Sequence, residues 1–423
     1  MTADVARGEW SRRELAAGAA LAGLPVSAFA SADPLSGAAL YADVKTYAGF
    51  GEHRTGTAGD EAVTAWLERE LRAAGYAVER QGFDYPVFSL QTAAVELAGR
   101  RIEAFPVWTP RAGVVAAPLS VAPRPGAIVV MSFPYGTGAP LEASAVYRTP
   151  VATAIAAGAA GVVIVTENPL GELVAYNALP NAPPWPVPVV GVAGRQGAAL
   201  EAAAEGGADV RLRIAGGLHA GRAENVIARR RGRGKPLVIS TPKSGWFTCA
   251  GERGSGIAIW LGLARRLATR ADLGLMLVAA SGHEFDGYGG RLFAEHLAPK
   301  PAEARGWVHI GANVASYDFA LRDGAITRLD HPQAGRRLAV SEALLPAARE
   351  AFAGQVGYQQ PVDVEVHGAP GELAEYQRRG YRPLVGVVGM HPLHHTRRDL
   401  PDATGPAVLE PVARGLAAVV ERL

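Results

Sequence analysis

The sequence predicts an α/β fold with a central, mostly parallel sheet. From Asn225 onward, short apolar runs alternate with longer amphipathic stretches. Strands that are buried on both faces of a parallel sheet have continuous apolar sequences of this kind. Alternating strands and helices favour a sheet that is covered by helices on both faces. The expected strands are Leu237–Thr241, Leu275–Ala280, Trp307–Ser316 and Pro383–Val388.

Helical spacing of apolar residues predicts the elements between these strands. The first expected helix, Asp60–Ala74, is followed by Gly75, a residue that commonly ends a helix. Further helices are expected at Gly256–Ala268, Arg291–Leu297, Ser341–Ala353 and Gly405–Leu423.

Composition excludes several classes of protein. A chain of 423 residues is long for one core, so two domains plus tails are expected. The net charge of +2 and the absence of basic blocks interleaved with aromatic residues argue against nucleic-acid binding. No apolar run reaches the roughly 18 residues that span a bilayer. The single Cys249 excludes an internal disulfide.

The N-terminus has the layout of a twin-arginine export signal. Arg12–Arg13 precedes the weakly apolar stretch Leu15–Ala30, and Ala30–Ala32 is a small-residue cleavage site. An Ala-rich helix is the alternative, but Pro25 would interrupt it. We therefore expect residues 1–32 to be removed and the protein to be exported, to the periplasm or the extracellular space.

Residues 101–219 differ in texture from the rest of the chain. Pro and Gly are dense there, and short β-like runs alternate with Ala-rich helical runs. Clusters of charged residues are nearly absent from this segment, which indicates a module without a catalytic site of its own. We expect an insert at 101–219 within a catalytic domain formed by 33–100 and 220–423.

Ionisable residues follow three of the predicted strands. Glu252–Arg253 follows the first, His283–Glu284 the second, and a histidine-rich segment with His391, His394 and His395 the last. Because the carboxyl ends of parallel strands meet at one edge of a sheet, these groups are expected to converge. Glu and His are zinc ligands, and three ligands with one open position make a catalytic site. Taken alone, His283–Glu284 has a simpler explanation, because acidic residues are common at helix N-termini, where they offset the helix dipole.

The order of several motifs resembles the zinc aminopeptidase family that also contains the glutaminyl cyclases, in the subgroup with an inserted protease-associated domain. The resemblance implies a phosphorylase/hydrolase-like zinc exopeptidase fold. It rests on Arg54–Thr57, Ala157–Val163, Pro186–Val192, Asn225–Ala228, and His395–Thr396 with Asp399.

The resemblance also implies which metal ligands remain. Where two-zinc members carry the ligands of the second metal, this chain has Pro242 and Asn313. The first-metal positions fall on Glu252, Glu284 and His395. One zinc per chain is therefore expected rather than two, and a site without metal is the alternative. His391 or His394 could replace His395 as the ligand.

The resemblance assigns the remaining polar residues to catalysis and substrate binding. His283 stands where the family has a carboxylate base, and an imidazole can transfer protons near neutral pH. Arg253 either stabilises negative charge on the substrate or simply pairs with Glu252; both readings stay open. Substrate contacts are expected from Lys243, Glu372 and His394.

The expected function is hydrolysis of an amide bond in a small peptide or aminoacyl-type substrate by a metal-dependent enzyme. Two alternatives remain open at this point. One is a metal-free protein that binds peptides or glycans without turnover. The other is an acyl transfer reaction like that of the glutaminyl cyclases.

Overall fold

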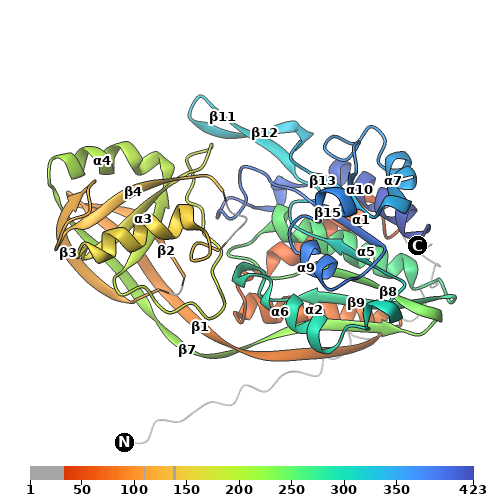
Figure 1. Cartoon of the computed structure of the whole chain (residues 1–423). Helices are drawn as coiled ribbons and strands as arrows, with labels where there is room; N and C mark the ends of the chain where they lie inside the picture. Colours follow the sequence, from red (N-terminus) through yellow and green to blue (C-terminus); the bar gives the residue numbers. More distant parts are fainter. Residues whose placement is uncertain (1–32, 109, 137–139) are drawn as a thin grey trace, which may run out of the picture. The chain divides into compact units, whose positions relative to one another are not determined.

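The centre of the fold is a sheet whose middle strands run parallel. The computed structural model describes residues 33–108, 110–136 and 140–423, so the predicted export segment lies outside the described residues. The middle strands are β9 (Leu273–Ala280), β8 (Arg233–Pro242), β10 (Gly306–Ile310) and β15 (Leu384–Val388), in that spatial order (Figure 1). The predicted α/β class with a mostly parallel central sheet is confirmed.

Antiparallel strands border this parallel centre. On one side β7 (Asp209–Arg230) pairs antiparallel with β9. On the other side β13 (Arg337–Val340) pairs antiparallel with β15, and the short β14 (Val362–Asp363) lies parallel to β13.

Alternate residues of the middle strands enter different hydrophobic clusters. Leu275 and Leu277 pack with α1 (Gly37–Gly49), α5 (Ser255–Leu267) and α10 (Pro406–Val420), whereas Met276 and Val278 pack with α6 (Tyr288–His296) and α9 (Leu373–Arg378). Both faces of the sheet are therefore buried, which explains the continuous apolar runs in the sequence. Helices α2 (Ala58–Ala73), α7 (Leu345–Ala351) and α8 (Val364–His367) also belong to this part of the chain.

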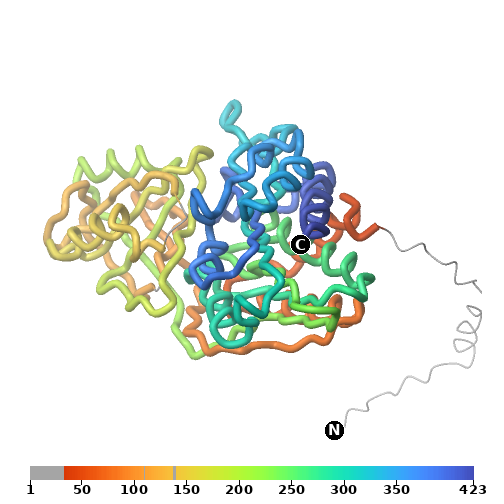
Figure 2. The backbone as a smooth tube through the Cα atoms, turned by 45° about the vertical axis from the view of Figure 1, so that its right-hand side comes forward, coloured from red at the N-terminus to blue at the C-terminus, as the bar shows by residue number. Residues whose placement is uncertain are grey.

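A long two-stranded ribbon connects the central sheet with the segment predicted as an insert. β1 (Ala77–Leu97) pairs antiparallel with β7 from Ala77–Arg229 to Leu97–Val210. The other strands of the segment are β2 (Arg100–Pro106), β3 (Gly113–Ser120), β4 (Ile128–Pro134), β5 (Gly161–Glu167) and β6 (Val189–Ala193), with helices α3 (Ala145–Ala156) and α4 (Gly197–Glu205). The path of this segment can be followed in Figure 2 by its colour, from orange to yellow-green.

The expected strand Trp307–Ser316 is too long. β10 ends at Ile310, and the chain then turns through Asn313, which has a left-handed φ of 54°. The backbone N–H of Asn313 donates to the carbonyl of Glu252 at 2.9 Å. The chain goes on into a separate hairpin, β11 (Tyr317–Arg322) and β12 (Ala325–Pro332). The residues after the strand therefore belong to the site rather than to the sheet.

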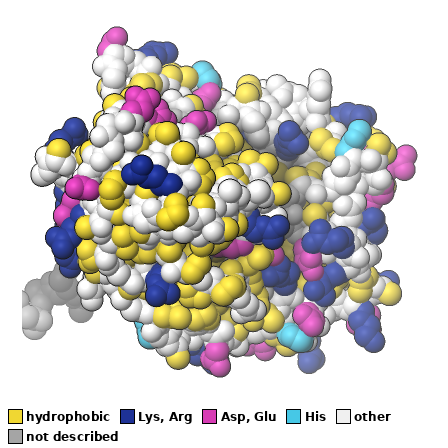
Figure 3. Space-filling model, turned by 60° about the vertical axis from the view of Figure 1, so that its left-hand side comes forward, with side chains coloured by type: hydrophobic (Ala, Val, Ile, Leu, Met, Phe, Trp, Pro, Cys, Tyr) yellow, Lys and Arg dark blue, Asp and Glu magenta, His cyan; other side chains and the backbone are white. Residues whose placement is uncertain are grey.

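Charged side chains of both signs lie on the surface (Figure 3). Figure 3 shows Lys and Arg side chains interspersed with Asp and Glu on the face that it displays. Among the described helices, none has the length and apolar character needed to cross a membrane.

Candidate metal centre

A π-helical turn places Glu252 at the entrance to α5. The turn spans Ala250–Gly254 and follows Cys249, whose φ of 49° is left-handed. Asp399 holds the turn, because its two carboxylate oxygens accept the backbone N–H groups of Gly251 at 2.7 Å and of Glu252 at 2.9 Å. Single π turns in helices often occur at functional sites. The side chain of Glu252 is completely buried.

His395 faces Glu252 from the loop after β15. Its Nδ1 lies 2.9 Å from the backbone carbonyl of Ala175, which can only accept a hydrogen bond. Nδ1 therefore carries the ring proton, and Nε2 of the neutral ring has a lone pair. That Nε2 lies 3.3 Å from Oε1 of Glu252, and neither atom has a hydrogen-bond partner among the described residues. Two buried lone pairs in contact repel unless a proton or a metal ion lies between them.

His394 completes a compact group with these two residues. Glu252, His394 and His395 each offer a ligand atom within 4.8 Å of the others, and they form the only such group found among the described residues. Nδ1 of His394 lies 3.8 Å from Oε2 of Glu252 and accepts a bond from Nδ2 of Asn313 at 2.9 Å. Burial holds the pKa of His394 well below its usual range, so its ring is neutral.

The donor set fits zinc. One carboxylate and two imidazoles are ligands that this ion prefers, and Oε1 and Oε2 of Glu252 and Nε2 of His395 are buried without a hydrogen-bond partner among the described residues. His394 can offer Nδ1 only by giving up its bond from Asn313. Glu252 and His395 can therefore bind the ion without losing a hydrogen bond, whereas His394 must first lose its bond from Asn313.

Arg253 supplies a positive charge at the same carboxylate. Its Nη2 lies 2.6 Å from Oε1 of Glu252, and both side chains are fully buried. The contact is close but poorly aligned, because neither Nη atom makes a hydrogen bond with the described residues. Burial alone would raise the pKa of Glu252. The positive charge of Arg253 is the largest opposing influence, and the pKa of Glu252 is held well below the usual range.

The structure does not bring Glu284 into this group. Its Oε1 accepts from the backbone N–H of Thr55 at 2.6 Å and from the Thr55 hydroxyl at 2.9 Å. Its Oε2 accepts from the hydroxyl of Ser244 at 2.7 Å. Each carboxylate oxygen thus has a donor, and the side chain ties the loop at Thr55 to the end of β8.

Lys243 also lies in a separate interaction. Its Nζ forms a completely buried ion pair with Asp60 of α2. Asp60 accepts further bonds from the hydroxyl of Ser281, at 2.7 Å, and from the backbone N–H of Gly56, at 3.0 Å. Lys243 is therefore held by Asp60 in a structural ion pair and does not make the substrate contact that the sequence predicted.

His283 and Glu372 are brought together at a pocket. Nδ1 of His283 lies 2.9 Å from Oε1 of Glu372, and both side chains line a hollow of about 230 Å³ together with Asn177, Arg291 and Tyr376. Glu252, His394 and His395 do not line it. The predicted residues thus form two groups, a buried cluster and an open pocket.

The segment predicted as an insert reaches the buried cluster. Ala175 exchanges two bonds with His395, through its N–H to the His395 carbonyl at 3.0 Å and through its own carbonyl to Nδ1. The N–H of Ala178 donates to the carbonyl of Glu284 at 2.9 Å, and Nδ2 of Asn168 donates to the carbonyl of Pro392 at 2.7 Å. Most of these bonds use backbone atoms, which leave no signal in a sequence.

Solved structures share this arrangement of elements. A zinc aminopeptidase from Bacillus subtilis matches with a TM-score of 0.71 at 17% identity, over 92% of this chain and 95% of that one. The chain has the fold of the zinc aminopeptidases. A peptidase M28 precursor from Shewanella amazonensis matches this aminopeptidase fold with a TM-score of 0.69 at 14% identity, over 90% of this chain and 91% of that one.

An aminopeptidase from an Aneurinibacillus strain matches at 17% identity with a TM-score of 0.62, over 90% of this chain and 92% of that one. The aminopeptidase fold is therefore shared over nearly the whole length of both partners. No family model and no curated protein matches the sequence.

Proposed function

We propose that the protein is a metal-dependent hydrolase of amide bonds that acts on small peptides or aminoacyl-type substrates with one metal ion. The observation that carries the proposal is the contact between Nε2 of His395 and Oε1 of Glu252, two buried acceptors 3.3 Å apart. The aminopeptidase fold supports it, since a peptidase site would lie at the same edge of the sheet.

Glu252, His394 and His395 would hold the metal ion. A zinc ion supplies a Lewis acid for the scissile carbonyl and lowers the pKa of bound water. Asp399 and Asn313 contact the turn and the ring that present the ligands, so they would orient the ligands without binding the ion. Arg253 keeps Glu252 ionised, as a metal ligand must be.

His283 is the proton-transfer group in this proposal. Its ring is partly exposed at the pocket, and its side chain is held by Glu372. Peptide substrates would enter through this pocket, and the insert would limit their size, since Pro140 and Asn177 contribute to the wall. The twin-arginine motif supports export to the periplasm or beyond.

One observation favours a second candidate, a metal-free protein that binds peptides. The buried guanidinium of Arg253 already offers Glu252 a positive partner at 2.6 Å. A buried carboxylate with such a partner is charge-compensated without a metal ion.

Metal content of the purified protein separates the two candidates. Elemental mass spectrometry should find about one zinc per chain, as for a mononuclear site with three protein ligands. Glu252→Gln and His395→Gln should each lose the zinc, while Glu375→Gln, which alters a carboxylate of the pocket, should retain it. No zinc after reconstitution would overturn the proposal and favour the metal-free candidate.

Activity is then tested on the zinc-loaded protein. A library of short peptides and aminoacyl amides should yield products whose combined mass has gained one water. Loss of ammonia or of water from the substrate would instead indicate a cyclising acyl transfer, and binding without turnover would indicate the metal-free function.

A further inference from the structure

A chain of hydrogen-bonded side chains runs from the interior of the sheet to the pocket at His283. Nε1 of Trp307 donates to Oγ of Ser240 at 2.8 Å, and Oγ of Ser240 lies 2.8 Å from Nδ1 of His309. Nε2 of His309 lies 3.3 Å from Oε2 of Glu372, whose Oε1 meets Nδ1 of His283 at 2.9 Å. Ser240 and His309 are direct neighbours in the β8–β10 ladder.

The direction of each bond in this chain follows from its two ends. At the inner end, the indole N–H of Trp307 can only donate, so Ser240 accepts from it. At the outer end, the ionised carboxylate of Glu372 can only accept, so Nε2 of His309 donates to it. The other nitrogen of the neutral ring, Nδ1, then accepts the hydroxyl proton of Ser240.

The same reasoning fixes the tautomer of His283. An ionised carboxylate can only accept, so Nδ1 of His283 must be the donor to Glu372. Burial alone would raise the pKa of Glu372, but the two imidazoles beside it outweigh this and hold the pKa well below the usual range. Nε2 of His283 is left with a lone pair and with no partner among the described residues.

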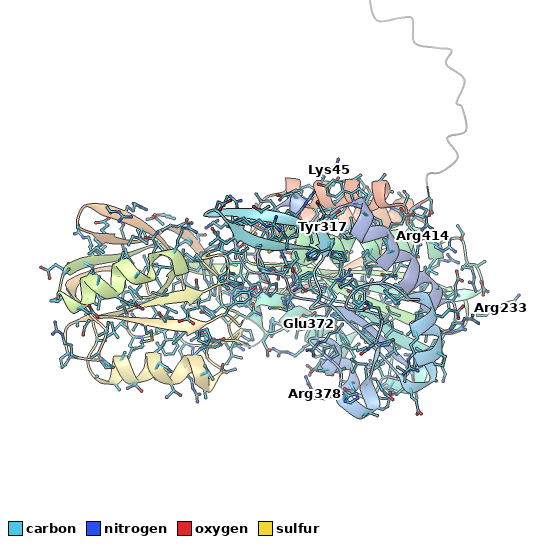
Figure 4. The ribbon with its side chains drawn as sticks, turned by 90° about the horizontal axis from the view of Figure 1, so that it is seen from above. Lys45, Arg233, Tyr317, Glu372, Arg378 and Arg414 are labelled. Carbon is cyan, nitrogen blue, oxygen red and sulfur yellow. The ribbon has the colours of Figure 1, made fainter. Side chains whose placement is uncertain are left out.

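The chain is graded from buried to exposed. Trp307 is fully buried and the side chain of His309 is 5% exposed, whereas those of Glu372 and His283 are 19% and 18% exposed. Figure 4 labels Glu372 in the interior of the view and Arg378 near its edge. The free nitrogen therefore lies where a substrate can reach it, and His309 and Trp307, which lie behind Glu372, are shielded from water.

The group is not a second metal site. Among the described residues, no compact set of ligand atoms includes His283, Glu372 or His309. The two imidazole nitrogens instead contact different oxygens of one carboxylate. Such an arrangement is suited to orienting a ring and balancing its charge, as a buried carboxylate does for a catalytic histidine.

We propose that Glu372, supported by His309 and Ser240, is a positioning residue that holds His283 as the Nδ1–H tautomer with Nε2 as the base of the pocket. The role of Nε2 as a base toward a substrate rests on the proposed amide hydrolysis, whereas the tautomer of His283 does not depend on it. Glu372 then acts through His283 and is not itself a substrate contact.

The proton balance of the step is simple. The oxygen of a water molecule bonds to the carbonyl carbon of the amide, and one proton of that water passes to Nε2 of His283. The same proton passes to the amine nitrogen as the carbon–nitrogen bond breaks. The ring returns to its neutral Nδ1–H form, and the products are an acid and an amine.

The test is the tautomer of His283, measured by nitrogen NMR of the histidine rings in the full protein. The signal is assigned by its loss in His283→Asn. We expect a protonated Nδ1 and an unprotonated Nε2 in the wild type, with or without zinc. Glu372→Ala should give averaged shifts for the two nitrogens, because nothing then fixes the proton. Glu375→Ala is the matched control, since Glu375 lines the same pocket but pairs with Arg378 and Arg379, and it should leave the tautomer unchanged.

A kinetic readout separates positioning from substrate binding. Glu372→Ala should lower kcat at least about 10-fold with little change in KM, as expected when proton transfer is impaired. A raised KM at unchanged kcat, or a wild-type His283 that carries its proton on Nε2, would overturn the inference. If Glu372→Ala fails to fold, the wild-type spectrum alone still tests the tautomer of His283. Failure of the proposed function would appear as absent zinc or absent turnover and would leave the spectrum unaffected.

Discussion

Arg253 and Glu252, adjacent in sequence, form a buried ion pair in which Nη2 lies 2.6 Å from Oε1. Adjacent residues of an ordinary α-helix point in different directions, so their side chains seldom meet. The π-helical turn at Ala250–Gly254 lies where this pair forms. Nε of Arg253 donates to the carbonyl of Ser244 at 3.0 Å, which holds the guanidinium in place. The pair therefore determines how much net negative charge Glu252 presents to a metal ion.

Arg253→Met should make stability depend on zinc. Removing the guanidinium leaves a buried carboxylate without its partner, which typically costs about 3–5 kcal/mol. Zinc binding to the native state should recover part of that loss. Thermal unfolding with zinc and with a chelator measures the difference. Arg265→Met is the control, because Arg265 forms a partly buried ion pair with Asp43 that does not involve Glu252, and its Tm should not respond to zinc. An equal Tm of Arg253→Met in zinc and in chelator would contradict a metal site at Glu252.

Glu284→Gln should lower stability and leave the zinc content unchanged. The substitution replaces a carboxylate oxygen that accepts bonds from Thr55 or Ser244 with a donor group. Loss of buried bonds to a charged group costs about 1.5–3 kcal/mol. Denaturant unfolding and elemental analysis of the same sample provide the two measurements. Loss of zinc in this variant, with the fold retained, would restore Glu284 to the ligand set that the sequence predicted.

Lys243→Met should be among the most destabilising single substitutions. It leaves the buried Asp60 with hydroxyl and backbone donors but no cation, at a cost of about 3–5 kcal/mol. The double variant Lys243→Met/Asp60→Asn should be less destabilised than the sum of the single variants, since the unpaired charge is gone. Additive effects in this double-mutant cycle would show that the two side chains are not coupled.

Glu142 should make stability fall as pH rises from about 4.5 to about 7. Burial raises its pKa from 4.5 to about 7, and its Oε1 has no hydrogen-bond partner among the described residues. Between these values the unfolded chain has released the proton and the folded chain still binds it, so raising the pH favours unfolding. The loss is complete above about pH 7.

Glu142→Gln tests this by removing the titration. The free energy of unfolding of the variant should lose a pH-dependent decrease of about 1–3 kcal/mol, as expected from a shift of this size after allowance for solvent. Urea unfolding at several pH values measures it. A variant with the same pH dependence as the wild type would assign the decrease to other groups.

The sequence predicted the middle of the sheet well because burial on both faces leaves a continuous apolar run. Leu275–Ala280 and Pro383–Val388 correspond closely to β9 and β15. Only the start of β1 was predicted, as a strand after Gly75, and β7 was missed, since exposed residues interrupt the pattern of both strands and Pro86 lies within β1. Because the ribbon is exposed to solvent over much of its length, its sequence shows no clear alternation of apolar and polar residues.

The candidate site was predicted only in part. Placing Glu252 and His395 at strand exits was enough to bring them together, and His394 remained among the alternatives for the same loop. Glu284 also lies at a strand exit, but Thr55 and Ser244 satisfy its oxygens from distant parts of the chain. Hydroxyl groups of this kind carry no recognisable spacing, so the sequence could not separate a ligand from a structural carboxylate.

The bond between His395 and Ala175 makes the chemistry of the core depend on a segment outside it. The carbonyl of Ala175 determines which nitrogen of His395 is protonated, and so which nitrogen faces Glu252. A core that lacked residues 101–219 would keep every side chain of the cluster. Its His395 could then exchange the proton between its nitrogens, and part of the population would present an N–H to the metal position. In the proposed metal site, residues 101–219 would therefore determine which nitrogen of His395 is free to bind the ion, and their removal would weaken metal affinity without changing any metal-binding residue.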